Sequence, residues 1–127
     1  MYSVLFINRI QAGMKLEKIR NCPTKTLLAI NDTMVVINGK WKIPIIGTLR
    51  FGKKRFNDLE RTISGITPRM LSKELKELEA NSIVKRTVYN TVPITVEYEL
   101  TASGESLGNL LDAIIEWGVQ HRKNVVG

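Results

Sequence analysis

The feature that most constrains the fold is a change of hydrophobic period in the second half of the chain. Up to Ala80 the apolar residues recur every three or four positions, as in amphipathic helices. From Ile83 to Tyr89 and from Thr95 to Leu100 they alternate with polar residues, as in strands that bury one face. The segment Asn90–Pro93 between them favours a turn. The sequence therefore predicts a set of helices followed by a β-hairpin.

Four helices are expected before the hairpin and one after it. The best-defined start is Thr67-Pro68, because a threonine hydroxyl caps free backbone N–H groups and proline suits the first helical position. The expected helices lie at Leu27–Ile37, Trp41–Arg50, Arg55–Ile63, Pro68–Ala80 and from Thr101 to about residue 121. This order predicts an α+β, mainly helical, winged helix-turn-helix with an additional C-terminal helix.

One domain is expected, since 127 residues are too few for two. We expect residues 1–21 to form an N-terminal arm and residues 22–127 to form the domain, with Met14 as an alternative start to Met1. The single cysteine fits a reducing compartment, and no segment resembles a signal peptide, so we predict a cytoplasmic protein.

The charge of the chain points to a polyanionic partner. Nineteen Lys and Arg residues stand against twelve Asp and Glu, a net charge of +7. Nucleic acid is the commonest partner of such a domain, and an anionic membrane is a second. No stretch approaches the ~20 apolar residues of a membrane span, and we predict no membrane partner. Eight basic and three acidic residues lie between Arg50 and Lys76, so much of the excess falls on the expected helix-turn-helix.

The expected helix at Pro68–Ala80 has two unlike faces. A core face is predicted from three leucines at helical spacing: Leu71, Leu75 and Leu78. The opposite face is basic and hydroxylic, as a helix that reads DNA bases requires, and carries Arg69, Ser72, Lys73 and Lys76. Glu74 and Glu77 are expected between these faces, paired locally with Lys73 and Lys76. The alternative is an ordinary solvated helix face.

Other basic residues flank this helix on both sides. Those before it and those on the first strand would contact phosphates, which sets affinity and register rather than sequence preference. For any one of them the alternative is a role in solubility alone. The full set of predicted DNA-binding residues is Lys53, Lys54, Arg55, Thr67, Arg69, Ser72, Lys73, Lys76, Lys85 and Arg86.

The expected last helix is too apolar for a small domain that stays monomeric. We predict that it forms a homodimer interface, because a two-fold dimer reads paired DNA half-sites. Packing within one chain is the alternative. The apolar stripe comprises Leu107, Leu110, Leu111, Ile114, Ile115 and Trp117.

The sequence carries little that indicates an enzyme. Its one cysteine, Cys22, and its one histidine, His121, have no evident partner that would orient them as a nucleophile and a base. Metal-ligand spacing and a phosphate-binding loop are also missing from the sequence. We therefore predict no catalytic residues, no cofactor and no metal, with a thiol-dependent enzyme as a remote alternative.

Several short segments together resemble the HxlR-type regulators, a group related to the MarR-type regulators. They follow one another in the family's order and spacing over about three quarters of the chain. The segments are Cys22-Pro23, Gly39-Lys40-Trp41, Arg55-Phe56-x-x-Leu59, Gly65-Ile66-Thr67-Pro68-Arg69-Met70-Leu71, Leu75-x-x-Leu78, Val92-Pro93, Val96-Glu97-Tyr98-x-Leu100-Thr101-x-x-Gly104 and Trp117-Gly118.

The resemblance implies a homodimer that binds pseudo-palindromic promoter DNA and regulates transcription. It places the recognition helix at Thr67–Leu78 and the wing at Lys85–Val96. The chain departs from the family in the sequence before Met14 and in the wing tip, Asn90–Thr95, which has no basic residue. The missing charge weakens the case for deep insertion of the tip into a minor groove. A winged-helix module that binds proteins without specific DNA binding is the alternative function.

The resemblance also implies a role for Cys22. Some family members sense oxidants, quinones or aldehydes through a cysteine just before the first core helix, and Cys22 occupies that position. Lys18, Arg20 and Lys25 are near in sequence and would favour the thiolate. Such a thiol could be oxidised across a dimer or alkylated by a small-molecule effector. The alternative is a small inert residue at the edge of the dimer.

Overall fold

The computed structural model describes residues 16–126. The greater part of the predicted N-terminal arm, residues 1–15, lies outside this range. The chain divides into two compact units, one that ends at Gly39 and one that starts at Lys40. In the described part of the chain, no helix is both long and apolar enough to cross a bilayer.

The described part of the first unit contains helices α2 (Leu16–Arg20) and α3 (Pro23–Ile37). Hydrogen bonds to one carbonyl hold the turn between them. The Cys22 N–H donates to the Ile19 carbonyl oxygen at 3.1 Å, and the Thr26 hydroxyl donates to the same oxygen at 2.8 Å. Helix α2 therefore leads directly into α3.

Helix α3 ends where the sequence predicts but begins earlier. The prediction placed its start at Leu27, whereas the helix starts at Pro23. Proline is favoured there because its missing N–H is not needed in the first turn. Gly39, with φ of +83°, follows the end of the helix and supports the left-handed turn that most other residues resist.

Three apolar residues of α3 at helical spacing, Leu27, Ile30 and Met34, lie on its exposed side. Leu27, Ile30 and Met34 are 58%, 51% and 48% exposed, whereas Asp32 and Val36 are buried. An exposed apolar stripe on a helix is a candidate contact surface for another protein chain.

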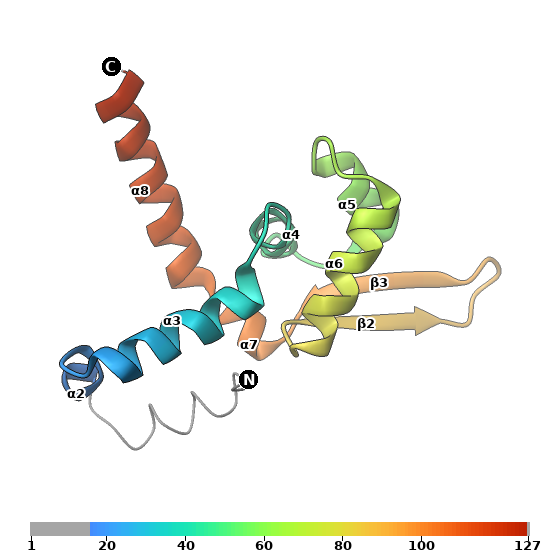
Figure 1. Cartoon of the computed structure of the whole chain (residues 1–127). Helices are drawn as coiled ribbons and strands as arrows, with labels where there is room; N and C mark the ends of the chain where they lie inside the picture. The colour runs from blue at the N-terminus through green and yellow to red at the C-terminus, as the bar shows by residue number, and fades with distance from the viewer. Residues whose placement is uncertain (1–15, 127) are drawn as a thin grey trace. The chain divides into compact units, whose positions relative to one another are not determined.

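The second unit is a winged helix-turn-helix, and the predicted fold class is confirmed. Helices α4 (Lys42–Leu49), α5 (Phe56–Thr62) and α6 (Pro68–Ala80) precede strands β2 (Val84–Tyr89) and β3 (Thr95–Leu100). Figure 1 shows these helices beside the hairpin, whose loop projects beyond α6. The helix starts and ends lie close to the predicted ones.

The structure contains a third strand, β1 (Lys54–Arg55), that was not predicted from the sequence. The described sheet has the order β1-β3-β2, and both pairings are antiparallel. A two-residue strand is too short to show alternation, and lysine and arginine do not favour strands strongly. In the register, Lys54 lies opposite Tyr98 and Arg55 opposite Glu97.

The prediction of one continuous C-terminal helix was wrong. The segment forms a short helix, α7 (Ala102–Glu105), and a long one, α8 (Gly108–Val126). Thr101 caps α7 as expected, since its hydroxyl accepts the Gly104 N–H at 3.1 Å. The break lies in a stretch of poor helix formers, which the apolar period had outweighed in the prediction: Ser103, Gly104, Ser106 and Gly108.

The core of the second unit lies where its helices meet the sheet. The three leucines predicted as the core face of α6 are buried, with at most 2% of each exposed. Burial of this face leaves the opposite face of α6 toward solvent. The other fully buried apolar residues on the helices include Ile45, Ile46 and Leu59.

Candidate nucleic-acid interface

The start of α6 is fixed as the sequence predicts. The Thr67 hydroxyl accepts the Met70 N–H at 3.2 Å, and Pro68 is the first helical residue. Gly65, with φ of +87°, allows the tight turn from α5. The helix thus begins at the surface with its partial positive charge toward solvent, which favours anions.

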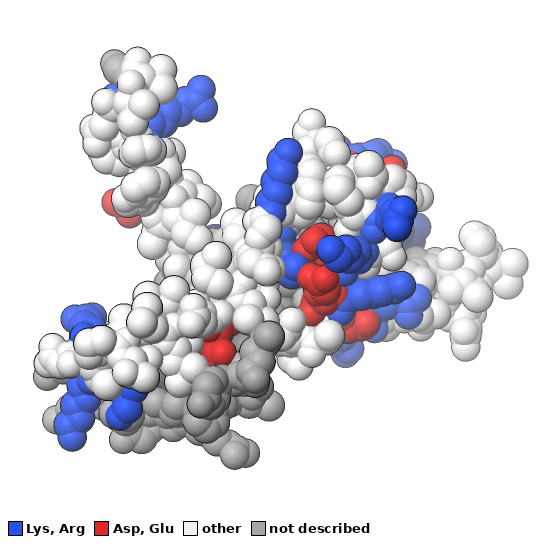
Figure 2. All heavy atoms as spheres, in the orientation of Figure 1, with Lys and Arg blue, Asp and Glu red and all other residues white. Residues whose placement is uncertain are grey.

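The exposed face of α6 carries the basic residues predicted for it. Arg69, Lys73 and Lys76 are exposed, and Ser72 is half-buried at the flank. Figure 2 shows basic side chains gathered over α6 and the adjoining part of the hairpin, around a small acidic patch. The projecting hairpin loop is uncharged in the same view, as its sequence requires.

One flank of α6 forms a hollow with the sheet. The lining from α6 contains Ser72, Lys76 and Glu79, and the lining from the sheet contains Arg86 and Tyr98. Arg86 stands directly opposite Tyr98 in the strand pairing. The hollow therefore brings a cation of the wing next to the basic face of the helix.

Alternation along the strands divides the basic residues of the sheet between two faces. Lys54 and Arg86 both pair with Tyr98, so all three side chains lie on the face that packs against α6. Lys85 is adjacent to Arg86 in sequence and must point to the opposite face. The prediction had grouped these two strand cations together, and the register separates them.

The opposite face of the sheet mixes both signs of charge. Lys85 lies across from Glu99 and Arg55 across from Glu97. Lys53 approaches Glu99 as well, with 4.0 Å between Nζ and Oε2. Three of the predicted DNA-binding cations therefore lie beside carboxylates on a face turned away from α6.

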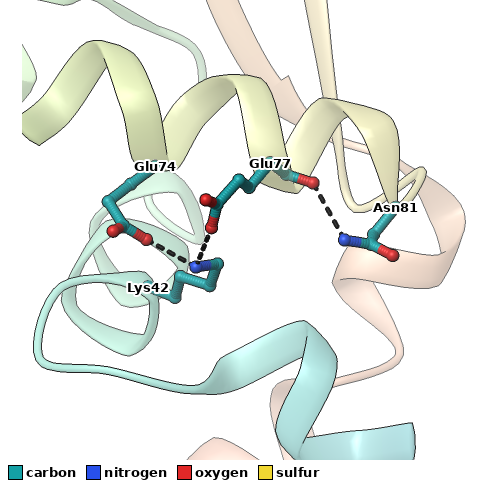
Figure 3. A network of polar contacts seen from close by, with 4 residues as sticks. All are labelled: Lys42, Glu74, Glu77 and Asn81. Atoms are coloured by element: carbon teal, nitrogen blue, oxygen red, sulfur yellow. Dashed lines mark hydrogen bonds and ion pairs between the residues drawn. The ribbon is translucent and has the colours of Figure 1, made fainter.

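Lys42 is a charged residue of this region that the sequence reasoning missed. Only 3% of its side chain is exposed, and Nζ donates to Glu74 Oε2 at 2.6 Å and to Glu77 Oε2 at 2.5 Å (Figure 3). The ion pairs of both carboxylates are therefore with Lys42 and not with the local lysines that were predicted, although Lys73 still attracts Glu77. The sequence contained one indication of this buried ion pair, which is a lysine at the start of the mainly apolar helix α4.

The pKa shifts follow from these contacts. Burial would lower the pKa of Lys42, but its hydrogen bonds and charge attraction to Glu74 and Glu77 outweigh burial and raise that pKa. The hydrogen bond from Lys42 lowers the pKa of Glu77. Lys42 and Glu77 therefore both carry charge at neutral pH.

Cys22 belongs to the first unit and occupies the N-cap position of α3, where its side chain makes no capping hydrogen bond. It is half-buried, and its thiol is free of any disulfide. Within residues 16–126, no three His, Cys, Asp or Glu side chains converge where they could hold a metal ion.

The residues predicted for a dimer interface differ in exposure. Leu111 is buried and belongs to the core of the chain, which corrects its assignment to an interface. Toward the C-terminal end of the stripe the apolar side chains are increasingly exposed to solvent. The Trp117 ring stacks on the His121 ring there, with the ring centroids 4.6 Å apart. Exposed fractions are 39% for Ile114, 61% for Ile115 and 67% for Trp117, whereas Leu107 and Leu110 are half-buried.

Comparison with known proteins decides the family. Residues 36–125 match the HxlR-like helix-turn-helix family. The chain belongs to this family. The HTH-type transcriptional regulator YtcD of Bacillus subtilis (strain 168) is 45% identical to this HxlR-like chain over 100 residues, which are 79% of each protein. The resemblance seen in the sequence is thereby confirmed, and the chain is a transcriptional regulator of the helix-turn-helix type.

Solved structures agree with this assignment. The redox regulator HypR in its oxidised form is 44% identical and superposes with a TM-score of 0.69, over 72% of this chain and 95% of that one. A MarR-family transcriptional regulator from Enterococcus faecalis V583 is 36% identical, with a TM-score of 0.71 over 82% of this chain and 96% of that one. The predicted relation to MarR-type regulators is confirmed.

Proposed function

We propose that this HxlR-like regulator binds specific promoter DNA as a homodimer, with α6 as its recognition helix. The observation that carries the proposal is the exposed basic face of α6, which starts at a capped helix N-terminus and lies opposite a buried leucine face. Arg69, in the first turn, can donate two hydrogen bonds to guanine in a major groove. Lys73 and Lys76 continue the same face toward the phosphates on either side.

The division of the sheet into two faces refines the set of phosphate contacts. Arg86 and Lys54 lie on the α6 side, so they reach the backbone of DNA seated on that helix. Lys85, Lys53 and Arg55 lie on the other face beside carboxylates and contribute less. Binding should therefore depend on Arg86 much more than on its neighbour Lys85.

The test compares variants of the full chain on DNA selected by the parent from random-sequence duplexes. Arg69→Ala should reduce the preference for selected over scrambled DNA by roughly 5- to 150-fold, the value of one paired base contact. Arg86→Ala should weaken binding to selected and to scrambled DNA equally. It should also lower the slope of log affinity against log salt concentration by about 1. Lys85→Ala is the matched control, with the same charge change on the opposite face.

Two results would argue against this assignment. Equal loss on selected and scrambled DNA in Arg69→Ala would remove Arg69 as a base reader. A Lys85→Ala loss as large as that of Arg86→Ala would show that the α6 side of the sheet is not the DNA side. A parent that dimerises but prefers no sequence would favour the protein-interaction module instead.

Exposed apolar surface supports the proposed homodimer. In the second unit, α4 and α8 line an open apolar groove that includes Ile43, Phe51 and Ile115, and Phe51 is 87% exposed. In the first unit, α3 exposes its own apolar stripe. A second copy that covers such surfaces would remove them from water, and two-fold assembly is the commonest arrangement of oligomers.

We also propose that Cys22 makes this regulator responsive to oxidants or electrophiles. The observations that favour it are the free, half-buried thiol at the start of α3 and the likeness to the redox regulator HypR. Because the chain has one cysteine, oxidation would join Cys22 to a thiol outside the chain, and alkylation would modify it directly. Diamide or a quinone should change DNA binding of the parent and leave Cys22→Ser unaffected. An equal response in both proteins would exclude the thiol.

A further inference from the structure

We propose that Lys42 is a positioning residue of the DNA-reading surface, which fixes the orientation of α6 by holding Glu74 and Glu77 against α4. The inference rests on the proposed DNA-binding function. It assigns a role in sequence discrimination to a buried side chain that cannot itself reach DNA.

The placement of Lys42 is unfavourable unless its partners compensate for it. It is the first residue of α4, where the partial positive charge of the helix end disfavours a cation. It is also 97% buried, which costs hydration free energy. Buried ion pairs of this kind are often no more stabilising than apolar residues of the same size, whereas geometric specificity is one role they can serve.

The geometry suits a role in orientation. Glu74 and Glu77 are one helical turn apart, on the flank of α6 opposite the hollow that faces the wing. One ammonium bonds both carboxylates, so neither rotation of α6 about its axis nor sliding along it leaves both bonds intact. At the C-terminal end of α6 the side-chain amide of Asn81 donates to the Glu77 carbonyl oxygen at 3.0 Å, a bond within the helix end itself (Figure 3).

Orientation of α6 matters because the base-reading residue is on the same helix. Arg69 lies five residues before Glu74 and about 140° around the helix axis from it. A small rotation of α6 would displace the guanidinium from the two acceptors of a guanine, whereas attraction to phosphates tolerates such a displacement. Loss of Lys42 should therefore affect discrimination between sequences more than affinity for DNA in general.

The experiment measures the affinity ratio for selected over scrambled DNA in three variants of the full chain. Lys42→Met removes the ammonium. Lys42→Met/Glu74→Gln/Glu77→Gln removes the whole charge network, so no unpaired buried charge threatens folding. Lys40→Met is the matched control, because it makes the same substitution only two residues away in sequence. Lys40 is exposed, and its ammonium lies over the Trp41 ring. Thermal unfolding establishes that each variant is folded.

We expect the ratio to fall by roughly tenfold in Lys42→Met and in the triple variant, the value of one impaired base contact. Lys40→Met should stay within about twofold of the parent, the range expected for an exposed charge. A triple variant that is folded and retains the ratio of the parent would overturn the proposal, whatever Lys42→Met does. If the triple variant is unfolded, Glu77→Ala decides, because alanine cannot accept a hydrogen bond from Lys42. The Glu77 side chain is 43% exposed, and Lys42 keeps its bond to Glu74 in this variant. An unchanged ratio there also overturns the proposal, and a reduced one supports it.

A readout without DNA separates this proposal from the proposed function. If the parent itself does not distinguish selected from scrambled DNA, the proposed function fails, and amide hydrogen exchange in residues 70–80 tests the anchoring alone. Faster exchange in the triple variant than in Lys40→Met, at equal global stability, would support the anchoring. Equal exchange in both would overturn it.

Discussion

Replacing Gly104 with alanine should strain the junction between the hairpin and α7. A Cβ at this position would lie 2.3 Å from the Ile83 carbonyl oxygen and 3.1 Å from the nearest Leu100 atom. The carbonyl is not free to move, because it accepts the Thr101 N–H at 3.0 Å and the Thr101 hydroxyl at 3.2 Å. Overpacking costs about 1–3 kcal/mol and a weakened hydrogen bond about 1 kcal/mol, so the free energy of unfolding should fall by about 2–4 kcal/mol.

Urea unfolding at one fixed protein concentration measures this loss, since assembly makes stability depend on concentration. Gly118→Ala is the matched control. A Cβ there meets nothing within 4 Å, and alanine inside α8 should add about 0.5–1 kcal/mol. The reasoning is refuted if Gly104→Ala unfolds at the urea concentration of the parent, or if both variants shift in the same direction.

Three further predictions follow from the same structure. Thr67→Ala should lower the free energy of unfolding by about 1 kcal/mol in urea, because the Met70 N–H loses its acceptor, and Thr67→Ser should restore it. Trp117→Lys should shift the sedimentation coefficient toward the monomer, and a dimer as tight as the parent's would exclude this surface. Lys42 lowers the pKa of Glu77 below the ordinary glutamate value of 4.5. The charged Glu77 carboxylate therefore stabilises the fold fully above pH 4.5, and this stabilisation is lost as the pH falls through the lowered pKa. Melting temperature should therefore fall less steeply below about pH 4.5 in Glu77→Gln than in the parent, and parallel curves would contradict the assignment.

The elements that could be predicted from the sequence are those set by neighbouring residues. The start of α6 depends on a threonine and a proline next to each other, and its core face on three leucines within one segment. The hairpin likewise depends on alternation over six residues in each strand. Short-range patterns of this kind survive into the structure because local and tertiary preferences agree.

The features that were missed depend on residues far apart in the chain. Lys42 meets its carboxylates across 32 and 35 residues, and no local pattern could indicate that pairing. Strand β1 exists only because β3 supplies its partner. The break before α8 differs from these two features, because a local signal for it was present in the poor helix formers Ser103, Gly104, Ser106 and Gly108. The predicted apolar period continued through that break and concealed it.

The number of charged residues in a sequence does not determine which of them face a partner. The net charge of +7 and its concentration between Arg50 and Lys76 indicate a polyanion partner but do not say which cations face it. The strand register separates Arg86 from Lys85, and the fold buries Lys42 between two carboxylates. Fewer cations are therefore available to contact DNA than the net charge implies. If so, affinity should depend strongly on a few positions around α6 and weakly on the remaining cations, which is the pattern that distinguishes specific recognition from general attraction to a polyanion.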